Sequence, residues 1–123
     1  MKTMKLAISS TGDTLESAVD PRFGRAAQFV LYDTETDTFT VHDNQRNLNA
    51  AQGAGIQSAQ TVVDLHADWL LSGHCGPKAF RVLATAGVKV GVGAEGTVAE
   101  TIERFKRGEF RETDGADVEG HWS

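Results

Sequence analysis

The sequence of 123 residues has little of several residue types, and each scarcity excludes a class of structure. A single cysteine forbids an internal disulfide and is typical of a chain kept in a reducing compartment. No apolar run reaches the roughly 20 residues that a membrane helix needs. The apolar run in the opening MKTMKLAISSTGD is also too short for the core of a signal peptide. We therefore expect a cytoplasmic protein, bacterial or archaeal, with no membrane partner.

Positive charge is in deficit as well. The chain has 12 basic and 17 acidic residues and a formal net charge of -5, which argues against a dedicated nucleic-acid-binding protein. With 40% apolar and 24% charged residues, the composition is that of one globular domain. We expect residues 1–107 to form this domain. Residues 108–123 are rich in charge and lack periodicity, so we expect a flexible C-terminal tail there.

Several motifs of known chemistry are missing. The sequence has no CxxC pair, no Cys/His metal spacing and no Walker-type phosphate loop. The glycine-rich stretch GVGAEG does not follow a first strand, where a dinucleotide-binding turn would stand. A two-metal nuclease would need a carboxylate within the first strand, but residues 4–9 contain none, and Asp68 stands at the wrong end of its strand. These absences argue against the corresponding enzymes.

Apolar periodicity predicts five strands and three helices. We expect strands at 4–9, 27–35, 38–44, 68–73 and 88–93, and helices at 48–67, 76–87 and 97–108. The order β-β-β-α-β-α-β-α predicts an α/β fold with a mixed five-stranded sheet and helices on both faces. Ribonuclease H-like folds share this order.

Local signals mark the ends of the expected helices. Asn49 is a candidate N-cap for the first helix. Pro77 fits the first turn of the second helix, and Gly87 fits its end. Thr97 with Glu100 three residues later predicts a capping box at the start of the third.

The loop DPRFGRAAQF holds the first candidate binding residues. Arg22 and Arg25 offer many hydrogen-bond donors to an anion, and the carboxylate of Asp20 could brace the loop. The alternative is a plain turn whose arginines pair with surface acids, and the residues alone favour this alternative slightly.

The loop GHCGPK holds the second set. It follows a strand and begins a helix, where α/β sheets bind ligands and where free N–H groups favour anions. Gly73 and Gly76 would let a ligand approach the backbone, and Lys78 adds a charge. We expect a lowered pKa for Cys75 here. An equally weighted alternative is a small thiol that faces inward.

Cysteine catalysis would need an oriented base beside Cys75. His42 and His66 are the plausible bases, but nothing in the sequence orients either one. We therefore expect no enzyme activity and no catalytic residue.

Five stretches together resemble a known family: KLAISS, VDPRFGRAAQFVLYD, AAQGAGIQSAQ, LLSGHCGPKAF and AGVKVGVG. They are similar to the dinitrogenase iron–molybdenum cofactor biosynthesis family over about residues 4–107. The resemblance implies a ribonuclease H-like fold and non-covalent binding of an anionic molybdenum-containing sulfide cluster. The member that the motifs resemble most comes from sulfate-reducing bacteria and carries a molybdenum–copper sulfide cluster.

The resemblance also implies which residues face such a cluster. The cofactor-binding residues expected from it are Arg22, Phe23, Gly24, Arg25, His74, Cys75, Gly76, Pro77 and Lys78. Among these, Cys75 and His74 are the candidate metal ligands, and Phe23 with Phe80 would supply apolar walls.

Three alternatives remain open at the level of sequence. The cargo could be an iron–molybdenum cofactor or its precursor. The chain could instead be a regulatory or scaffold module that binds a partner protein through the same face. A phosphate- or nucleotide-binding enzyme that uses the His74 loop is the third.

Overall fold

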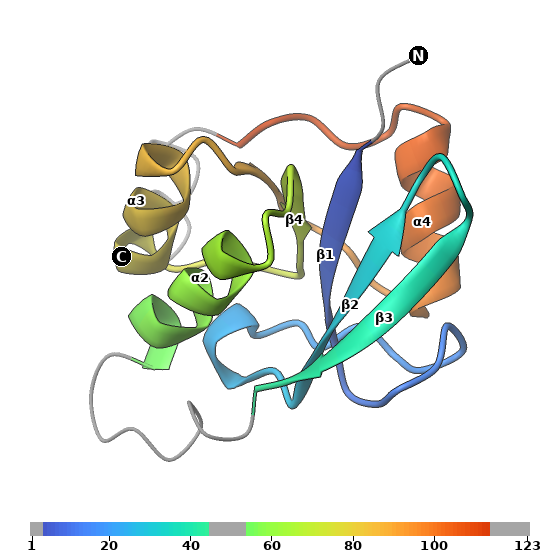
Figure 1. Ribbon diagram of the computed structural model, residues 1–123, viewed down its shortest axis with the longest axis horizontal. Coiled ribbons are helices and arrows are strands. Elements are labelled where there is room, and N and C mark those ends of the chain that lie inside the picture. The colour runs from blue at the N-terminus through green and yellow to red at the C-terminus, as the bar shows by residue number, and fades with distance from the viewer. Residues whose placement is uncertain (1–3, 45–53, 114–123) are drawn as a thin grey trace.

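The computed structural model describes residues 4–44 and 54–113. The strands are β1 (Lys5–Ser10), β2 (Gln28–Asp33), β3 (Thr38–Asp43), β4 (Trp69–Leu71) and β5 (Lys89–Gly91). The helices are the short 3-10 turn η1 (Phe23–Arg25), α2 (Ala54–Asp64), α3 (Pro77–Thr85) and α4 (Val98–Lys106). The predicted mixed five-stranded sheet with three α-helices is confirmed for this part of the chain (Figure 1).

The sheet has the strand order β3-β2-β1-β4-β5. The strand β1 pairs antiparallel with β2 and parallel with β4, and β4 pairs parallel with β5. The carboxyl ends of β1, β4 and β5 therefore meet at one edge of the sheet. This edge carries both loops that the sequence analysis selected.

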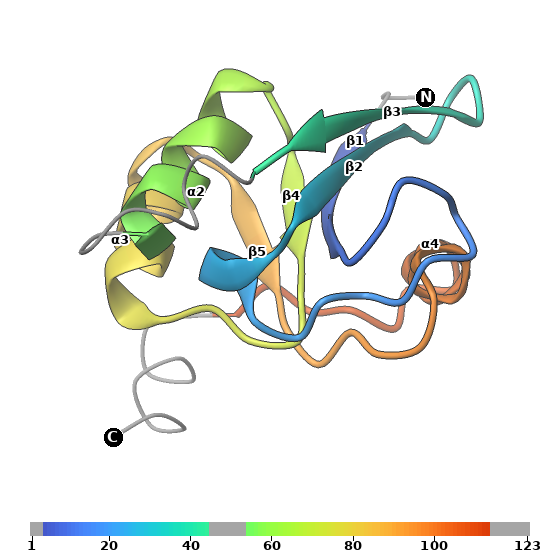
Figure 2. The ribbon, with the colours of Figure 1, turned by 90° about the horizontal axis from the view of Figure 1, so that it is seen from below.

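Helices cover both faces of the sheet because successive side chains of the buried strands point to opposite faces and are apolar on each. In β1, Leu6 and Ile8 face the layer of α4, whereas Ala7 faces the layer of α2 and α3. Figure 2 shows α2 and α3 together on one side of the sheet and α4 on the other. The two cores hold β1 at the centre, so the start and end of this strand are fixed from both sides.

The predicted helix ends are found where the structure describes them. Pro77 opens α3, and Gly87 closes it with a positive φ of 84°. The Thr97 side chain accepts the Glu100 N–H while the Glu100 side chain accepts the Thr97 N–H, which is the expected capping box. The predicted cap Asn49 lies outside the described residues.

Residues 109–113 pack against the domain, whereas the sequence predicted a flexible tail from residue 108 onward. The Thr113 N–H donates to the Val90 carbonyl at 2.7 Å, and the Arg104 guanidinium lies over the Phe110 ring. Glu109 accepts hydrogen bonds from Arg104 and Arg107. This segment therefore packs on β5 and α4, and its hydrogen bond to Val90 joins residues too far apart in sequence for local periodicity to show it.

Within residues 4–44 and 54–113, the longest helices fall short of the length and apolar character required to cross a bilayer.

Candidate functional site

The two selected loops lie against each other at the carboxyl edge of the sheet. The His74 N–H donates to the Pro21 carbonyl at 2.9 Å, and the Phe23 N–H donates to the His74 carbonyl at 3.4 Å. These bonds form an isolated parallel bridge between Arg22 and His74. Residues about 50 positions apart in the chain thus form one surface, which we call the paired loops, residues 20–25 and 73–78.

The first of the paired loops turns its arginines outward because its phenylalanine points inward. Phe23 is buried, and its ring centroid lies 5.4 Å from that of Phe29 in the core. As predicted, the carboxylate of Asp20 braces the turn, since it accepts the Arg22 N–H at 3.0 Å. The expectation that Phe23 forms a wall of the binding surface is wrong, because the ring is part of the core shared with α2 and α3.

Three cationic side chains gather on the paired loops. Arg22, Arg25 and Lys78 are exposed, and none of them forms an ion pair with any residue of 4–44 or 54–113. The alternative in which the arginines pair with surface acids therefore finds no support in the described chain. Unpaired guanidinium and ammonium groups keep their full capacity to bind an anion.

The start of α3 adds hydrogen-bond donors to this charge. Gly76 is the N-cap residue, and it has no side chain to cap the helix. Within the described residues, the N–H groups of Cys75, Gly76, Lys78 and Ala79 have no hydrogen-bond acceptor. Such orphan donors and the positive end of the helix dipole favour a negatively charged ligand.

Cys75 departs from its prediction. Its side chain is fully buried in the core beside α2 and α3, and burial raises the pKa of the thiol to about 12. The expected lowering of this pKa is wrong, because loss of hydration outweighs the helix dipole at this depth. The inward-facing thiol is the alternative that the structure supports, so Cys75 does not face a ligand on the paired loops.

Gly73 serves a different contact from the one predicted. A Cβ atom at this position would lie 2.6 Å from Pro21 Cα and 2.7 Å from the Pro21 carbonyl oxygen. The close approach that glycine allows is therefore the approach of one loop to the other, not of a ligand. Gly76 has open space around the same position, which suits a surface that a ligand could reach.

The histidines do not form a catalytic pair with Cys75. His42 lies on β3, where its Nε2 atom is 2.8 Å from the Thr40 hydroxyl. His66 precedes β4 and so lies at the amino end of the strand whose carboxyl end leads to Cys75. His74 is half-buried, and its backbone joins the two loops. No group of three or more His, Cys, Asp or Glu side chains able to hold a metal ion occurs among the described residues.

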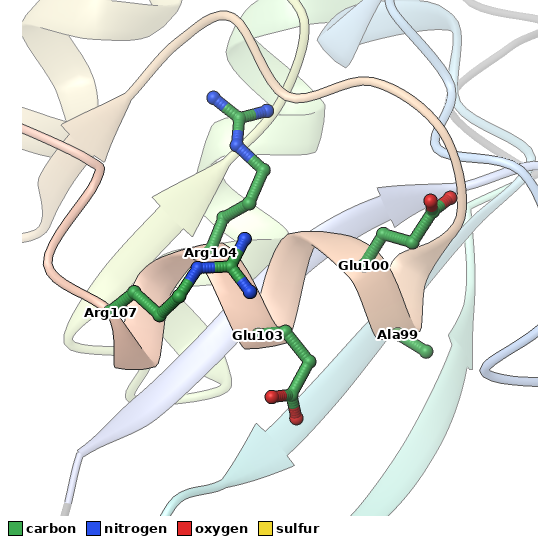
Figure 3. Close-up of a pocket in the computed structure, with 5 residues that line it drawn as sticks. All are labelled: Ala99, Glu100, Glu103, Arg104 and Arg107. Atoms are coloured by element: carbon green, nitrogen blue, oxygen red, sulfur yellow. The ribbon is translucent and has the colours of Figure 1, made fainter.

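Two surface hollows lie elsewhere. One, of about 350 Å³, lies along α4 and is lined by Ala99, Glu100, Glu103, Arg104 and Arg107 (Figure 3). The other, of about 440 Å³, lies beside the ends of α2 and α3 and includes Asp64, His66 and Asp68. Neither of these two hollows is lined by a residue of the paired loops.

Sequence reasoning missed two buried serines beneath the paired loops. Ser9 is the next-to-last residue of β1, Ser72 follows β4, and both residues are fully buried. Their signal was a small polar residue at the end of each of two buried apolar strands. A hydroxyl in such a place needs a partner, and the partners here are loop carbonyls.

Comparisons with known proteins place this chain among relatives of similar size. A model of the family described as "Dinitrogenase iron-molybdenum cofactor" matches residues 4–108. The apo form of the orange protein from Desulfovibrio gigas is 41% identical and superposes with a TM-score of 0.89, covering 91% of this chain and 94% of that chain.

Two further relatives cover most of the chain. A DUF35-family protein from Thermotoga, solved by NMR, is 38% identical with a TM-score of 0.77, covering 89% of this chain and 92% of that one. An uncharacterized protein from Methanocaldococcus jannaschii is 25% identical over 112 residues, which are 89% of this chain and 92% of the relative. The family resemblance inferred from the motifs is confirmed.

Proposed function

Because the chain belongs to the dinitrogenase iron–molybdenum cofactor family, we propose that it binds and carries an anionic, molybdenum-containing sulfide cluster on the paired loops. One observation carries this proposal. Arg22, Arg25 and Lys78, which have no ion-pair partner among the described residues, lie on the two loops that meet at the uncapped start of α3. A cluster that brings its own sulfide needs positive charge and N–H donors rather than a set of protein thiolates.

The donor set fits non-covalent binding better than ligation. Cys75 is the only thiol in the chain, and its buried, protonated side chain is a poor ligand for a surface-bound metal. Charge-assisted hydrogen bonds from the two guanidinium groups can reach the sulfide atoms of a cluster instead. We include His74 as a candidate donor or metal ligand, since it is only half-buried and stands where the two loops join.

The molybdenum–copper sulfide cluster is the cargo that we favour, because the chain is similar over nearly its whole length to the orange protein. On this proposal the protein has a ribonuclease H-like fold but no nuclease activity. It acts in the cytoplasm as a carrier or store of the cluster, not as an enzyme. The family description also supports a second cargo, an iron–molybdenum cofactor or its precursor. Both cargoes are anionic and would use the same cations.

Titration of the purified apo-protein with tetrathiomolybdate and copper tests the proposal. We expect a coloured species that survives desalting and contains molybdenum and copper in a fixed ratio to protein. Visible absorption follows the titration, and metal analysis gives the composition. Retention of an iron–molybdenum cofactor precursor but not of this cluster would transfer the proposal to the second cargo. Retention of neither would contradict cluster carriage and favour a module that binds a partner protein.

A double variant tests whether the two arginines supply the positive charge that binds the cluster. We expect Arg22→Ala with Arg25→Ala to weaken cluster binding by at least tenfold per lost contact, at about 1.5–3 kcal/mol for each charged hydrogen bond. Both side chains are exposed, so the fold should survive. The titration, with circular dichroism in the far ultraviolet, checks both points.

Lys5→Ala with Lys89→Ala is the matched control. It removes the same charge from two exposed lysines that begin β1 and β5, at the amino end of these strands. We expect this variant to bind the cluster like the unmodified protein. Equal weakening in both double variants would mean that net charge, and not the paired loops, governs binding.

A further inference from the structure

A pair of buried serines lies beneath the paired loops. The Ser9 hydroxyl donates to the Asp20 carbonyl at 2.7 Å, and its oxygen lies 2.9 Å from the Ser72 hydroxyl oxygen. The Ser72 hydroxyl lies 3.3 Å from the His74 carbonyl, to which it can donate. Two adjacent strand ends, of β1 and β4, thus each place a hydroxyl under one of the two loops. We call Ser9 and Ser72 the serine pair.

The serine pair acts on the backbone that aims the cations. Asp20 precedes Arg22 by two residues, and its side-chain carboxylate accepts the Arg22 N–H. The His74 carbonyl accepts the Phe23 N–H from the first loop while it lies within reach of Ser72 in the second. The Ser9 proton holds the Asp20 carbonyl, and the single Ser72 proton can serve either Ser9 Oγ or the His74 carbonyl, so the pair stands within hydrogen-bond reach of a carbonyl on each side of the junction between the loops.

The two loops are closely packed where they meet. Gly73 presses against Pro21 so closely that even one additional carbon would overlap the Pro21 backbone. The Gly93 N–H donates to the Gly73 carbonyl at 2.9 Å and thereby ties the second loop to the segment after β5. The distance between the arginines and the start of α3 is consequently set by buried, mutually bonded groups, not by the exposed side chains themselves.

We propose that Ser9 and Ser72 are positioning residues that hold the arginine loop and the start of α3 at the spacing at which one cluster contacts both. This role rests on the function proposed above. A cluster of fixed size gains the contacts of both loops only if the loops are already placed, since any movement needed on binding subtracts from the affinity. Serine, rather than an apolar residue, stands at each strand end because a loop carbonyl must be held there.

Ser72→Ala tests this role with a readout beyond stability. We expect the variant to fold, to bind the tetrathiomolybdate–copper cluster about tenfold more weakly, as expected for the loss of one buried hydrogen bond, and to give a changed visible circular dichroism spectrum of the bound cluster. The spectrum reports the asymmetric surroundings of the cluster, which a merely structural hydroxyl would leave unchanged. Gly73→Ala is the second variant, because it forces the loops apart while both hydroxyls remain.

Thr101→Val is the matched control. Thr101 is fully buried on α4, and its hydroxyl has no hydrogen-bond partner within the described part of the chain. The change removes a buried hydroxyl without touching the paired loops, so affinity and spectrum should stay as in the unmodified protein. Unchanged affinity and spectrum in both Ser72→Ala and Gly73→Ala would overturn the positioning role and leave cluster carriage intact. Failure of the unmodified protein to retain the cluster would instead overturn the proposed function, and the positioning role with it.

Discussion

Cys75 illustrates how two effects compete at a single residue. The start of α3 favours the thiolate, but helix dipoles contribute only about 0.3–1 kcal/mol near the surface. Burial opposes ionisation by up to several pKa units, and the Cys75 side chain is fully buried. Burial therefore decides, and it raises the pKa of the thiol to about 12. The proposed binding role of this motif therefore rests on its backbone and its neighbours, not on its sulfur.

The raised pKa makes a prediction for alkaline stability. The thiol ionises near its ordinary pKa of 9.0 in the unfolded chain but only near about 12 in the folded protein. The folded state therefore keeps a proton that the unfolded state has lost, and stability falls as pH rises from about 9 towards 12. We expect Cys75→Ala to lose stability less steeply over this range. Chemical unfolding at a series of alkaline pH values measures both slopes, and parallel curves would contradict the burial of the thiol.

At the scale of elements, α4 owes its start to one local motif. The Thr97 hydroxyl accepts the Glu100 N–H at 3.1 Å, and the Glu100 carboxylate accepts the Thr97 N–H at 2.8 Å. These same bonds lower the pKa of Glu100. The carboxylate therefore supports the folded state above its ordinary pKa, and this support is lost as pH falls below it. The helix start is thus sensitive to acid.

We expect Thr97→Ala to destabilise the protein by about 1 kcal/mol, which is typical for the loss of an N-cap hydroxyl. Thr85→Ala is the comparison, since Thr85 is exposed on α3 and its hydroxyl only bonds back to the Arg81 carbonyl within the helix. Thermal or chemical unfolding of the two variants gives the difference. Equal stability of the two variants would mean that the capping box contributes nothing to the position of α4.

The elements that sequence predicted are those whose signals are local. Pro77, Gly87 and the Thr97 box each act within one helical turn, so their positions could be found without knowledge of the fold. The packing of residues 109–113 on β5 could not be found in this way. It depends on a hydrogen bond from Thr113 to Val90 and on a ring contact with Arg104, which no periodicity encodes.

In the candidate site, too, the local features could be predicted from the sequence and the long-range contacts could not. The arginines in a glycine-containing loop and the uncapped helix start are visible in the sequence, whereas the exposure of the arginines is known only from the structure. The inward direction of Phe23 and Cys75 is not, because both side chains join a core whose other members come from α2, α3 and the sheet. The contact of the two loops likewise depends on the parallel pairing of β1 with β4.

The molecule as a whole is an anion with a cationic edge. Its formal net charge is -5, yet Arg22, Arg25 and Lys78 are brought together by a fold in which β1 lies between β2 and β4. Charges beyond about 8–10 Å are largely screened at physiological ionic strength. An anionic cargo on the paired loops therefore responds mainly to these nearby cations and to the N–H groups of α3, and less to the acidic surface elsewhere.

This separation predicts how binding depends on salt. Because the three cations are exposed, added sodium chloride should screen their attraction for a cluster and lower its affinity progressively. We expect a shallower dependence in the Arg22→Ala, Arg25→Ala variant, which has fewer cations left to screen, and an unchanged dependence in the Lys5→Ala, Lys89→Ala control. Equilibrium titrations with tetrathiomolybdate and copper over a range of sodium chloride concentrations measure the three slopes. An affinity that does not change with salt in the unmodified protein would mean that ligation to the metal, and not charge, holds the cluster.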